Sequence, residues 1–190
     1  MKIVEHKIEK WGKYSRAAIP FLAEQGLKNM VGAEIGVYRG SHAGEVLTLL
    51  DIKKFYLIDP YEKYPGYRHV SSRNIPQAKT FALNKLKSFE DKIEWIYKKS
   101  DDAVKDITEP LDWVYIDGNH SLDFAYRDMV NYYPLIKPGG YLTGDDYCVC
   151  YKTEDDEGKL AVDKFVEENG YILNIATHGN KTPEWWIQKL

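Results

Sequence analysis

Cysteine is scarce in this sequence, and so are long apolar runs. The 190 residues contain two cysteines, Cys148 and Cys150, with one residue between them. Two thiols cannot build a disulfide framework or complete a zinc tetrad, so we expect both to be reduced structural thiols. Charges interrupt the N-terminal segment before an apolar run forms, so we expect neither a signal peptide nor a membrane-spanning helix. These absences make the cytoplasm the expected location.

An excess of positive charge is also missing. Lys and Arg number 26 and Asp and Glu number 29, for a net charge of −3. Proteins that grip phosphate backbones are usually basic, so we expect no nucleic acid among the partners, and no membrane. Hydrophobic residues make up 44% of the chain and charged ones 29%, a balance typical of globular proteins rather than disordered ones. At about 150 residues per domain, the length predicts one domain over residues 1–190.

Short apolar runs alternate with amphipathic stretches from about residue 31 onward. Seven runs read as strands, at residues 31–36, 54–59, 92–97, 111–117, 140–145, 171–176 and 184–189. Between them, apolar residues within 43–50, 78–89 and 122–133 repeat at intervals of three and four, as on one face of a helix. The alternation predicts a doubly wound, mostly parallel α/β sheet with helices on both faces.

The two ends of the chain depart from this alternation. Residues 177–183 are too few for a crossover helix, so we expect the last two strands to form an antiparallel hairpin. The apolar residues Tyr14, Ala17 and Phe21 are typical of a helix. We therefore expect a helical extension over residues 1–30 and the sheet-containing core over residues 31–190.

Polar residues stand at the carboxyl ends of the predicted strands, where open α/β sheets bind ligands. Glu34 is followed by Gly36, Tyr38 and Gly40, and the glycines allow a tight turn and close approach of a ligand to the backbone. The helix that begins there can receive an anionic group at its N-terminus. The spacing differs from the Gly-x-Gly-x-x-Gly of dinucleotide sites, so a pyrophosphate is not expected.

Two further strand ends indicate a nucleoside. Asp59 ends the second strand, close to the distance of about 20 residues from the glycine turn at which an acid meets ribose hydroxyls. Ser100 and Asp101 follow the third strand and suit the edge of an adenine, although they would equally cap the helix that begins there. Taken together at successive strand ends, these residues predict a bound nucleoside.

Four segments, EIGVYRGSHAG, YLIDPY, LDWVYIDGNHS and LIKPGGYLTGDDY, resemble class I S-adenosylmethionine-dependent methyltransferases over about residues 31–190. The sequence is most similar to the cation-dependent O-methyltransferases, of the catechol type and of the macrolide-sugar and cephamycin type. The resemblance implies a Rossmann-like sheet of seven strands in the order 3-2-1-4-5-7-6, with strand 7 antiparallel, and S-adenosylmethionine as the methyl donor. It also implies a set of cofactor-binding residues: Glu34, Gly36, Tyr38 and Gly40 at the methionine, Asp59 at the ribose, Ser100 and Asp101 at the adenine, and Asp117.

Carboxylates follow the fourth and fifth strands, at Asp117 and at Asp145 and Asp146. Neighbouring strands lie about 4.8 Å apart, so these acids can converge on one cation, and oxygen ligands suit Mg²⁺ or Mn²⁺ better than zinc. The resemblance places metal ligands at the same three positions. Adjacent strand residues point to opposite faces, so both Asp145 and Asp146 can ligate only if the chain has already left strand conformation. In the alternative, these two acids only cap the strand and the enzyme works without metal on nitrogen or an acidic hydroxyl.

His120 stands three residues after Asp117, where the resemblance implies a general base. Histidine titrates near neutrality, and a hydroxyl polarised by a cation needs only a modest base. In the alternative, His120 only packs against the helix that starts at Ser121. We therefore expect methyl transfer from S-adenosylmethionine to a small-molecule hydroxyl on a sugar, phenol or natural product, with a non-catalytic adenosyl-binding module as the rival of another class.

Residues 61–69 are rich in tyrosine and follow the predicted ribose acid directly. They read either as a lid over the acceptor or as an ordinary surface loop beside a basic helix. A helical N-terminus and surface aromatics are also compatible with a homodimer.

Overall fold

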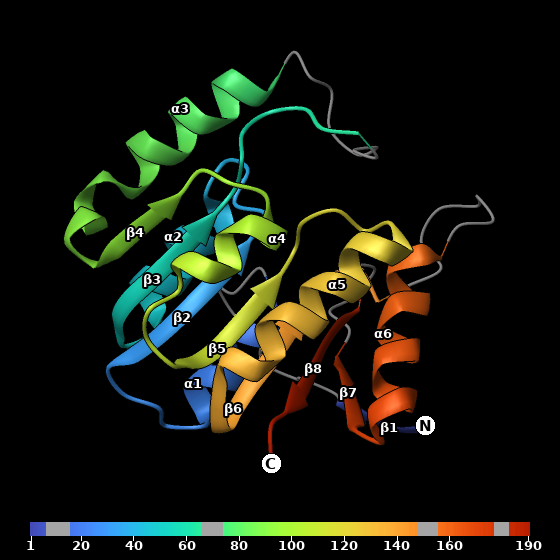
Figure 1. The fold of residues 1–190 in the computed structure, drawn as a ribbon. Helices are drawn as coiled ribbons and strands as arrows, with labels where there is room; N and C mark the ends of the chain where they lie inside the picture. The colour runs from blue at the N-terminus through green and yellow to red at the C-terminus, as the bar shows by residue number, and fades with distance from the viewer. Residues whose placement is uncertain (7–15, 66–73, 148–155, 177–182) are drawn as a thin grey trace.

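The apolar runs of the sequence form one twisted eight-stranded sheet in a computed structural model (Figure 1). The structure describes residues 1–6, 16–65, 74–147, 156–176 and 183–190. The strands are β1 (Lys2–His6), β2 (Met30–Ile35), β3 (Ile52–Ile58), β4 (Ile93–Ile96), β5 (Leu111–Ile116), β6 (Ile136–Gly144), β7 (Ile172–Ala176) and β8 (Glu184–Gln188). All seven predicted strands are present, with bounds that shift by up to four residues.

The strand order is β1-β7-β8-β6-β5-β2-β3-β4, and only β8 runs antiparallel to its neighbours. With β2 counted as strand 1, this is the order expected from the resemblance. β1 is an additional strand at the edge of the sheet, next to β7. The antiparallel pairing of β7 with β8 confirms the predicted hairpin, whose connecting residues 177–182 lie outside the described part of the chain. Cys148 and Cys150, which we expect to be reduced structural thiols, also lie outside the described part of the chain.

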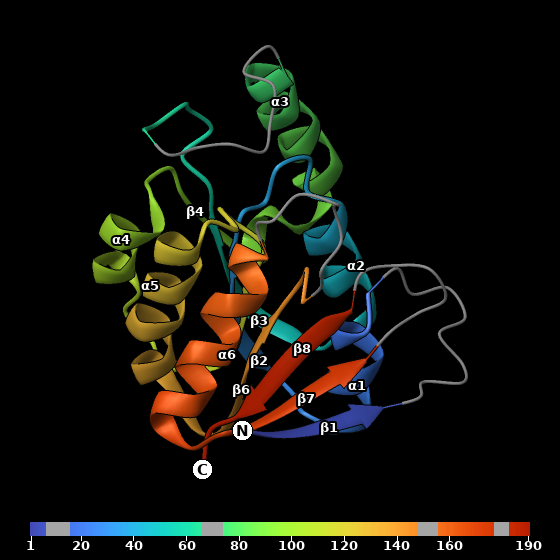
Figure 2. The same cartoon turned by 90° about the vertical axis from the view of Figure 1, so that its right-hand side faces the viewer.

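Helices cover both faces of the sheet, as the sequence predicts (Figure 2). The α-helices are α1 (Ala18–Glu24), α2 (Ser41–Leu49), α3 (Ile75–Leu86), α4 (Ser100–Ala103), α5 (Leu122–Tyr132) and α6 (Glu157–Asn169), and the 3₁₀ turns are η2 (Lys87–Lys92), η3 (Val104–Asp106) and η4 (Tyr133–Leu135). In Figures 1 and 2, α4, α5 and α6 lie on one face, and α1 and α2 lie on the other. None of the described helices is long and apolar enough to cross a membrane.

Side-chain alternation along the strands divides the core into two layers. Ala33 and Ile35 of β2 pack in the layer beneath α5 and α6, whereas Phe55 and Leu57 of β3 pack in the layer beneath α1 and α2. Successive strand residues point to opposite faces, so strands that are buried on both sides read as nearly continuous apolar runs. This explains why these segments are recognisable in the sequence.

The expectation of a purely helical segment over residues 1–30, and of seven strands in all, is wrong. Residues 2–6 form β1, which pairs parallel with β7 at the edge of the sheet, and α1 covers only part of the remaining segment. The Nε2 atom of His6 lies 2.9 Å from Oδ1 of Asn174, and its ring lies 4.7 Å from that of Trp186. These long-range contacts hold an otherwise exposed, charged pentapeptide in the sheet.

Candidate active site

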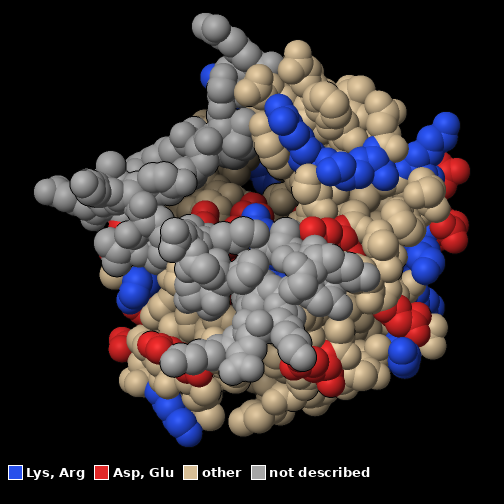
Figure 3. Space-filling view, turned by 180° about the vertical axis from the view of Figure 1, so that it is seen from behind, with Lys and Arg blue, Asp and Glu red and all other residues tan. Residues whose placement is uncertain are grey.

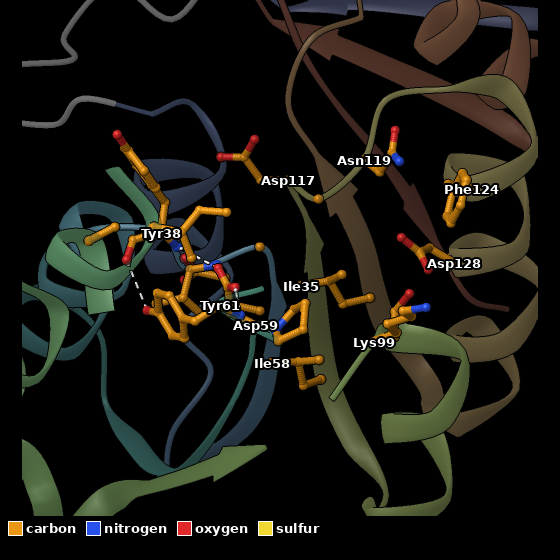
Figure 4. Close-up of a pocket in the computed structure, with 18 of the residues that line it drawn as sticks. Ile35, Tyr38, Ile58, Asp59, Tyr61, Lys99, Asp117, Asn119, Phe124 and Asp128 are labelled. Carbon is orange, nitrogen blue, oxygen red and sulfur yellow. Dashed lines mark hydrogen bonds between the residues drawn. The ribbon is translucent and has the colours of Figure 1, made fainter. Parts of the chain in front are cut away.

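The carboxyl ends of β2, β3 and β5 open into a pocket of about 350 Å³. It lies where the chain order reverses, because β2 pairs with β3 on one side and with β5 on the other. Side chains converge on it from several elements (Figure 4): Tyr38, Asp59 and Tyr61 from one side, Asn119, Phe124 and Asp128 from the other, and Ile35 and Ile58 between them. A ligand that fills the pocket therefore touches the loop after β2 and the start of α5 together.

The loop after β2 crosses close to the end of β5. Gly36 has a φ of +88°, and a Cβ atom added there would lie 2.0 Å from the backbone oxygen of Asp117. The N–H of Asp117 donates to the carbonyl of Ile35 over 2.8 Å, which fixes the two strand ends together. Gly40, with a φ of +69°, ends the loop and precedes α2. Glycine is needed at both positions for the turn that the sequence predicts.

Asp59 holds this loop through three backbone groups. Its Oδ2 accepts hydrogen bonds from the N–H of Val37 (3.1 Å) and of Tyr38 (2.9 Å), and its Oδ1 accepts one from the N–H of Tyr61 (2.8 Å). The hydroxyl of Tyr61 donates to the carbonyl of Tyr38 over 2.9 Å (Figure 4). Burial raises the pKa of Asp59, although the three N–H donors oppose it. A ribose in the pocket would meet a carboxylate whose position is fixed.

Glu34 is buried and does not face the pocket as a free carboxylate. Its Oε2 lies 3.0 Å from Nδ1 of His42, and the His42 ring stacks on Tyr115 at 3.8 Å. Burial raises the pKa of Glu34. Burial alone would lower the pKa of His42, but the charge and hydrogen bond of Glu34 outweigh it and the pKa is raised. The two side chains are therefore held together by a buried hydrogen bond.

At the end of the pocket where the sequence predicts the adenine base, one of the two expected residues lies elsewhere. Ser100 lines the pocket, but Asp101 turns toward α5, where its Oδ1 accepts a hydrogen bond from Asn131 (3.1 Å) and its Oδ2 lies 3.2 Å from Arg127. The acid that lines this end is Asp128 of α5, which is 3% exposed (Figure 4). Burial raises its pKa to about 7.

His120 lies between two carboxylates at the other end of the pocket. Its Nε2 is 3.5 Å from Oδ1 of Asp117 and 3.6 Å from Oδ2 of Asp146. Burial alone would lower the pKa of His120, but Asp117 and Asp146 outweigh it and raise the pKa. The side chain remains 21% exposed, so a ligand can reach it.

Asp145 and Asp146 follow the end of β6, and the chain has left strand conformation there, as the ligand hypothesis requires. Asp146 has a φ of +54°, in the left-handed region. The two carboxylates take different partners: Asp146 faces His120, and Asp145 contacts the guanidinium of Arg16. Asp145 is buried, with its side chain 6% exposed.

A divalent ion does not fit the acids in this arrangement. Nη2 of Arg16 lies 3.4 Å from Oδ2 of Asp117, and its Nε lies 3.8 Å from Oε1 of Glu184, in addition to the contact with Asp145. The guanidinium thus pairs with two of the three carboxylates that the sequence assigned to a metal, Asp117 and Asp145, while Asp146 faces His120. Over the described ranges, no three His, Cys, Asp or Glu side chains form a group that would hold a metal ion.

The first part of the tyrosine-rich loop reaches across the pocket. The ring of Tyr64 lies 5.6 Å from that of Phe124 on α5, and Nζ of Lys99 lies 5.1 Å from the Tyr64 ring. Lys79 of α3 stands 3.6 Å from the ring of Tyr97. Lys and Arg side chains gather on the surface over α3 (Figure 3). Residues 66–69 of the predicted lid lie outside the described part of the chain.

The structure has three features of a class I methyltransferase fold. These are a doubly wound sheet with a reversed eighth strand, a glycine turn at the central strand and an acid at the end of the next strand. Residues 33–147 match a family model described as a methyltransferase domain. The match covers more than half of the chain, so the chain belongs to this methyltransferase family. No curated protein matches it.

Solved structures with the same fold include enzymes with different acceptors. An rRNA methylase from Streptococcus thermophilus is 17% identical with a TM-score of 0.63, over 91% of this chain and 94% of that one. An O-methyltransferase from Bacillus cereus in complex with SAH is 14% identical with a TM-score of 0.62, over 90% and 78%. The O-methyltransferase TomG from Streptomyces achromogenes, involved in tomaymycin synthesis and in complex with SAM, is 16% identical with a TM-score of 0.62, over 91% and 78%. At these identities the likeness shows a common fold.

Four residues of the site are not predicted from local sequence patterns: Arg16, His42, Asp128 and Glu184. Arg16 and Glu184 lie at opposite ends of the chain, so no local pattern links them. Asp128 lies within an amphipathic stretch, where an acid reads as solvent-facing. One signal was available for His42, since it lies eight residues after Glu34 and directly after the glycine turn.

Proposed function

We propose that this methyltransferase transfers the methyl group of S-adenosylmethionine to a hydroxyl oxygen of a small molecule, with His120 accepting the hydroxyl proton. The observation that carries the proposal is the position of His120 on the pocket wall, with its Nε2 between Asp117 and Asp146. A histidine so placed can take up a proton beside groups that stabilise the resulting imidazolium.

The residues of the pocket suit the methyl donor. Asp59 offers carboxylate oxygens to ribose hydroxyls, and Gly36 lets the loop after β2 lie against the backbone of Asp117, which shapes this wall of the pocket. Ser100 and Asp128 supply polar groups for the edge of the base. Asp117 and His120 line the same pocket, which supports binding of the proposed acceptor beside the donor.

When bound, S-adenosylmethionine supplies a methyl group on a sulfonium: the new O–C bond forms as the S–C bond breaks, and S-adenosylhomocysteine (SAH) leaves as a neutral thioether. The chain contributes position, because nucleophile and methyl carbon must be held about 3 Å apart and in line. Nε2 of His120 takes the proton from the hydroxyl. The carboxylates of Asp117 and Asp146 raise the pKa of His120, which makes the neutral imidazole a stronger base.

We call the part of the site around His120, Asp117 and Arg16 the acceptor end, because the proposed acceptor binds beside His120. Its charge favours a small molecule over nucleic acid. Arg16 there faces an excess of acidic groups, Asp117, Asp145 and Glu184, with Asp146 beside His120. A phosphate backbone gains its affinity from neutralisation by Lys and Arg, whereas acids outnumber Arg16 among the described residues of this cluster. A neutral hydroxylated acceptor avoids that repulsion.

The test combines a panel of sugars, phenols and hydroxylated natural products with isotope-labelled S-adenosylmethionine. With an accepted substrate, we expect His120→Ala to lower turnover by about 10² to 10⁴-fold, as for loss of a general base, while calorimetry shows unchanged SAH affinity. His6→Ala is the matched control, because His6 lies on β1, away from the pocket. Label incorporation into nitrogen alone, or full activity of His120→Ala, would contradict the proposal.

A further inference from the structure

We infer that the guanidinium of Arg16 takes the place of a divalent cation at the acceptor end of the pocket. All three of its nitrogens face carboxylates: Nη1 contacts Asp145, Nη2 lies 3.4 Å from Asp117, and Nε lies 3.8 Å from Glu184. Asp117 and Asp145, two of the three acids that the sequence assigned to a metal, therefore have a positive partner within the chain itself.

Burial makes this partner necessary. The side chains of Asp145 and Glu184 are 6% and 3% exposed, whereas that of Arg16 is 29% exposed. Buried carboxylates are costly unless they are paired or protonated. Arg16 pairs with both of these buried carboxylates and is itself the more exposed partner.

The backbone beside Arg16 is fixed to the same acid cluster. Oε2 of Glu184 accepts a hydrogen bond from the N–H of Ala18 at 2.6 Å, and its Oε1 accepts one from the hydroxyl of Tyr115 at 3.0 Å. Ala18 begins α1 and stands two residues after Arg16. The position of the guanidinium is therefore set by a buried contact between the start of α1 and the start of β8, not by a free surface side chain.

Arg16 and a divalent ion exclude each other at these oxygens. Mg²⁺ requires nearly octahedral oxygen ligands at about 2.1 Å, and a guanidinium on the same carboxylates both occupies the oxygens and repels the ion. Asp117 and Asp145 cannot serve the two cations at once. It follows that the enzyme holds its positive charge at the acceptor end without taking up metal.

Cation binding at this cluster does not depend on which acceptor is methylated. Manganese binding is therefore measured directly, by titration of the protein with Mn²⁺ followed by electron paramagnetic resonance. We expect no saturable Mn²⁺ binding by the wild type, with or without SAH. The SAH affinity, measured in parallel by calorimetry, reports separately on the methyl-donor site, so the failure of either proposal can be recognised.

The decisive variant is Arg16→Gln, which frees the carboxylates. We expect it to gain Mn²⁺ binding at least about tenfold above the wild type, a change of about 1.4 kcal/mol, and the double variant Arg16→Gln/Asp145→Asn to lose that gain. Arg127→Gln is the matched control, because Arg127 pairs with Asp101 away from this cluster. One Mn²⁺ bound tightly by the wild type and lost in Asp145→Asn would overturn the inference, and this measurement remains decisive even if Arg16→Gln does not fold.

Discussion

Asp128 shows how a single acid can be positioned by its helix in a way that local sequence does not indicate. Asp101 is expected at the adenine because it follows a strand end. The packing of α4 against α5 instead turns Asp101 toward Asn131 and Arg127, and α5 presents Asp128 to the pocket. The direction of a four-residue helix is set by its neighbours, so no periodicity in the sequence could reveal it.

The raised pKa of Asp128 predicts a stability that depends on pH. The pKa is about 7 in the folded chain and about 3.9 when unfolded, so the folded state binds more protons between these values. Stability should therefore fall as pH rises from about 4 to about 7 and then level off. Between pH 5 and pH 8 the loss should be roughly 3 kcal/mol, measured by urea unfolding.

Asp128→Asn removes this titration, so its free energy of unfolding should decline less than that of the wild type over the same pH range. Asp123→Asn on the exposed side of the same helix is the control, and it should follow the wild-type curve. Parallel curves for Asp128→Asn and the wild type would show that Asp128 is ionised in the folded protein at all of these pH values.

At the scale of elements, the loop after β2 is the part of the site that the sequence specifies best. Its two glycines and the acid at the end of β3 are readable because a left-handed turn and a strand end have residue signatures. The edge strand β1 has no such signature. Its five residues include two charges and are mostly exposed, so pairing with β7, rather than local propensity, decides their conformation.

Gly36→Ala should damage this loop more than a backbone preference alone would. A Cβ atom at Gly36 would lie 2.0 Å from a backbone oxygen, so the loop must move away from β5 as well as adopt a strained φ. We expect the free energy of unfolding, measured with urea, to fall by ~3 kcal/mol, together with weaker SAH binding.

Gly26→Ala separates these two causes. Gly26 also has a positive φ, of +67°, but nothing lies within 4 Å of its Cβ position. The free energy of unfolding of Gly26→Ala should fall by only about 1 kcal/mol, the cost of the left-handed conformation alone. Equal losses in the two variants would mean that contact with the end of β5 does not constrain Gly36.

At the scale of the whole molecule, the order of the sheet is predictable and the electrostatics of the site are not. Apolar runs and connection lengths predict the strands and the final hairpin, and the resemblance to class I methyltransferases implies the strand order. Arg16 meets Asp117, Asp145 and Glu184 only because the fold brings together four distant segments. A sequence pattern identifies carboxylates at strand ends, but it cannot say which cation neutralises them.

The whole molecule should also respond to its ligand. SAH at about 100 times its dissociation constant adds about 2.7 kcal/mol to stability, which should raise Tm by about 5 to 10 °C for a chain of this size. Differential scanning fluorimetry checks this shift. NAD⁺ is the control ligand, because the glycine turn lacks the dinucleotide spacing, and an equal shift with NAD⁺ would argue for a different nucleotide site.

The directions of the first and last strands have a practical consequence. β1 runs parallel to β7, and β8 runs antiparallel to it, so Lys2 and Gln188 both lie at the amino edge of the sheet. Both chain ends lie at this edge in Figures 1 and 2. An affinity tag, a fluorophore or a biosensor surface attached at either terminus would therefore stand at the far side of the molecule and leave substrate entry unobstructed.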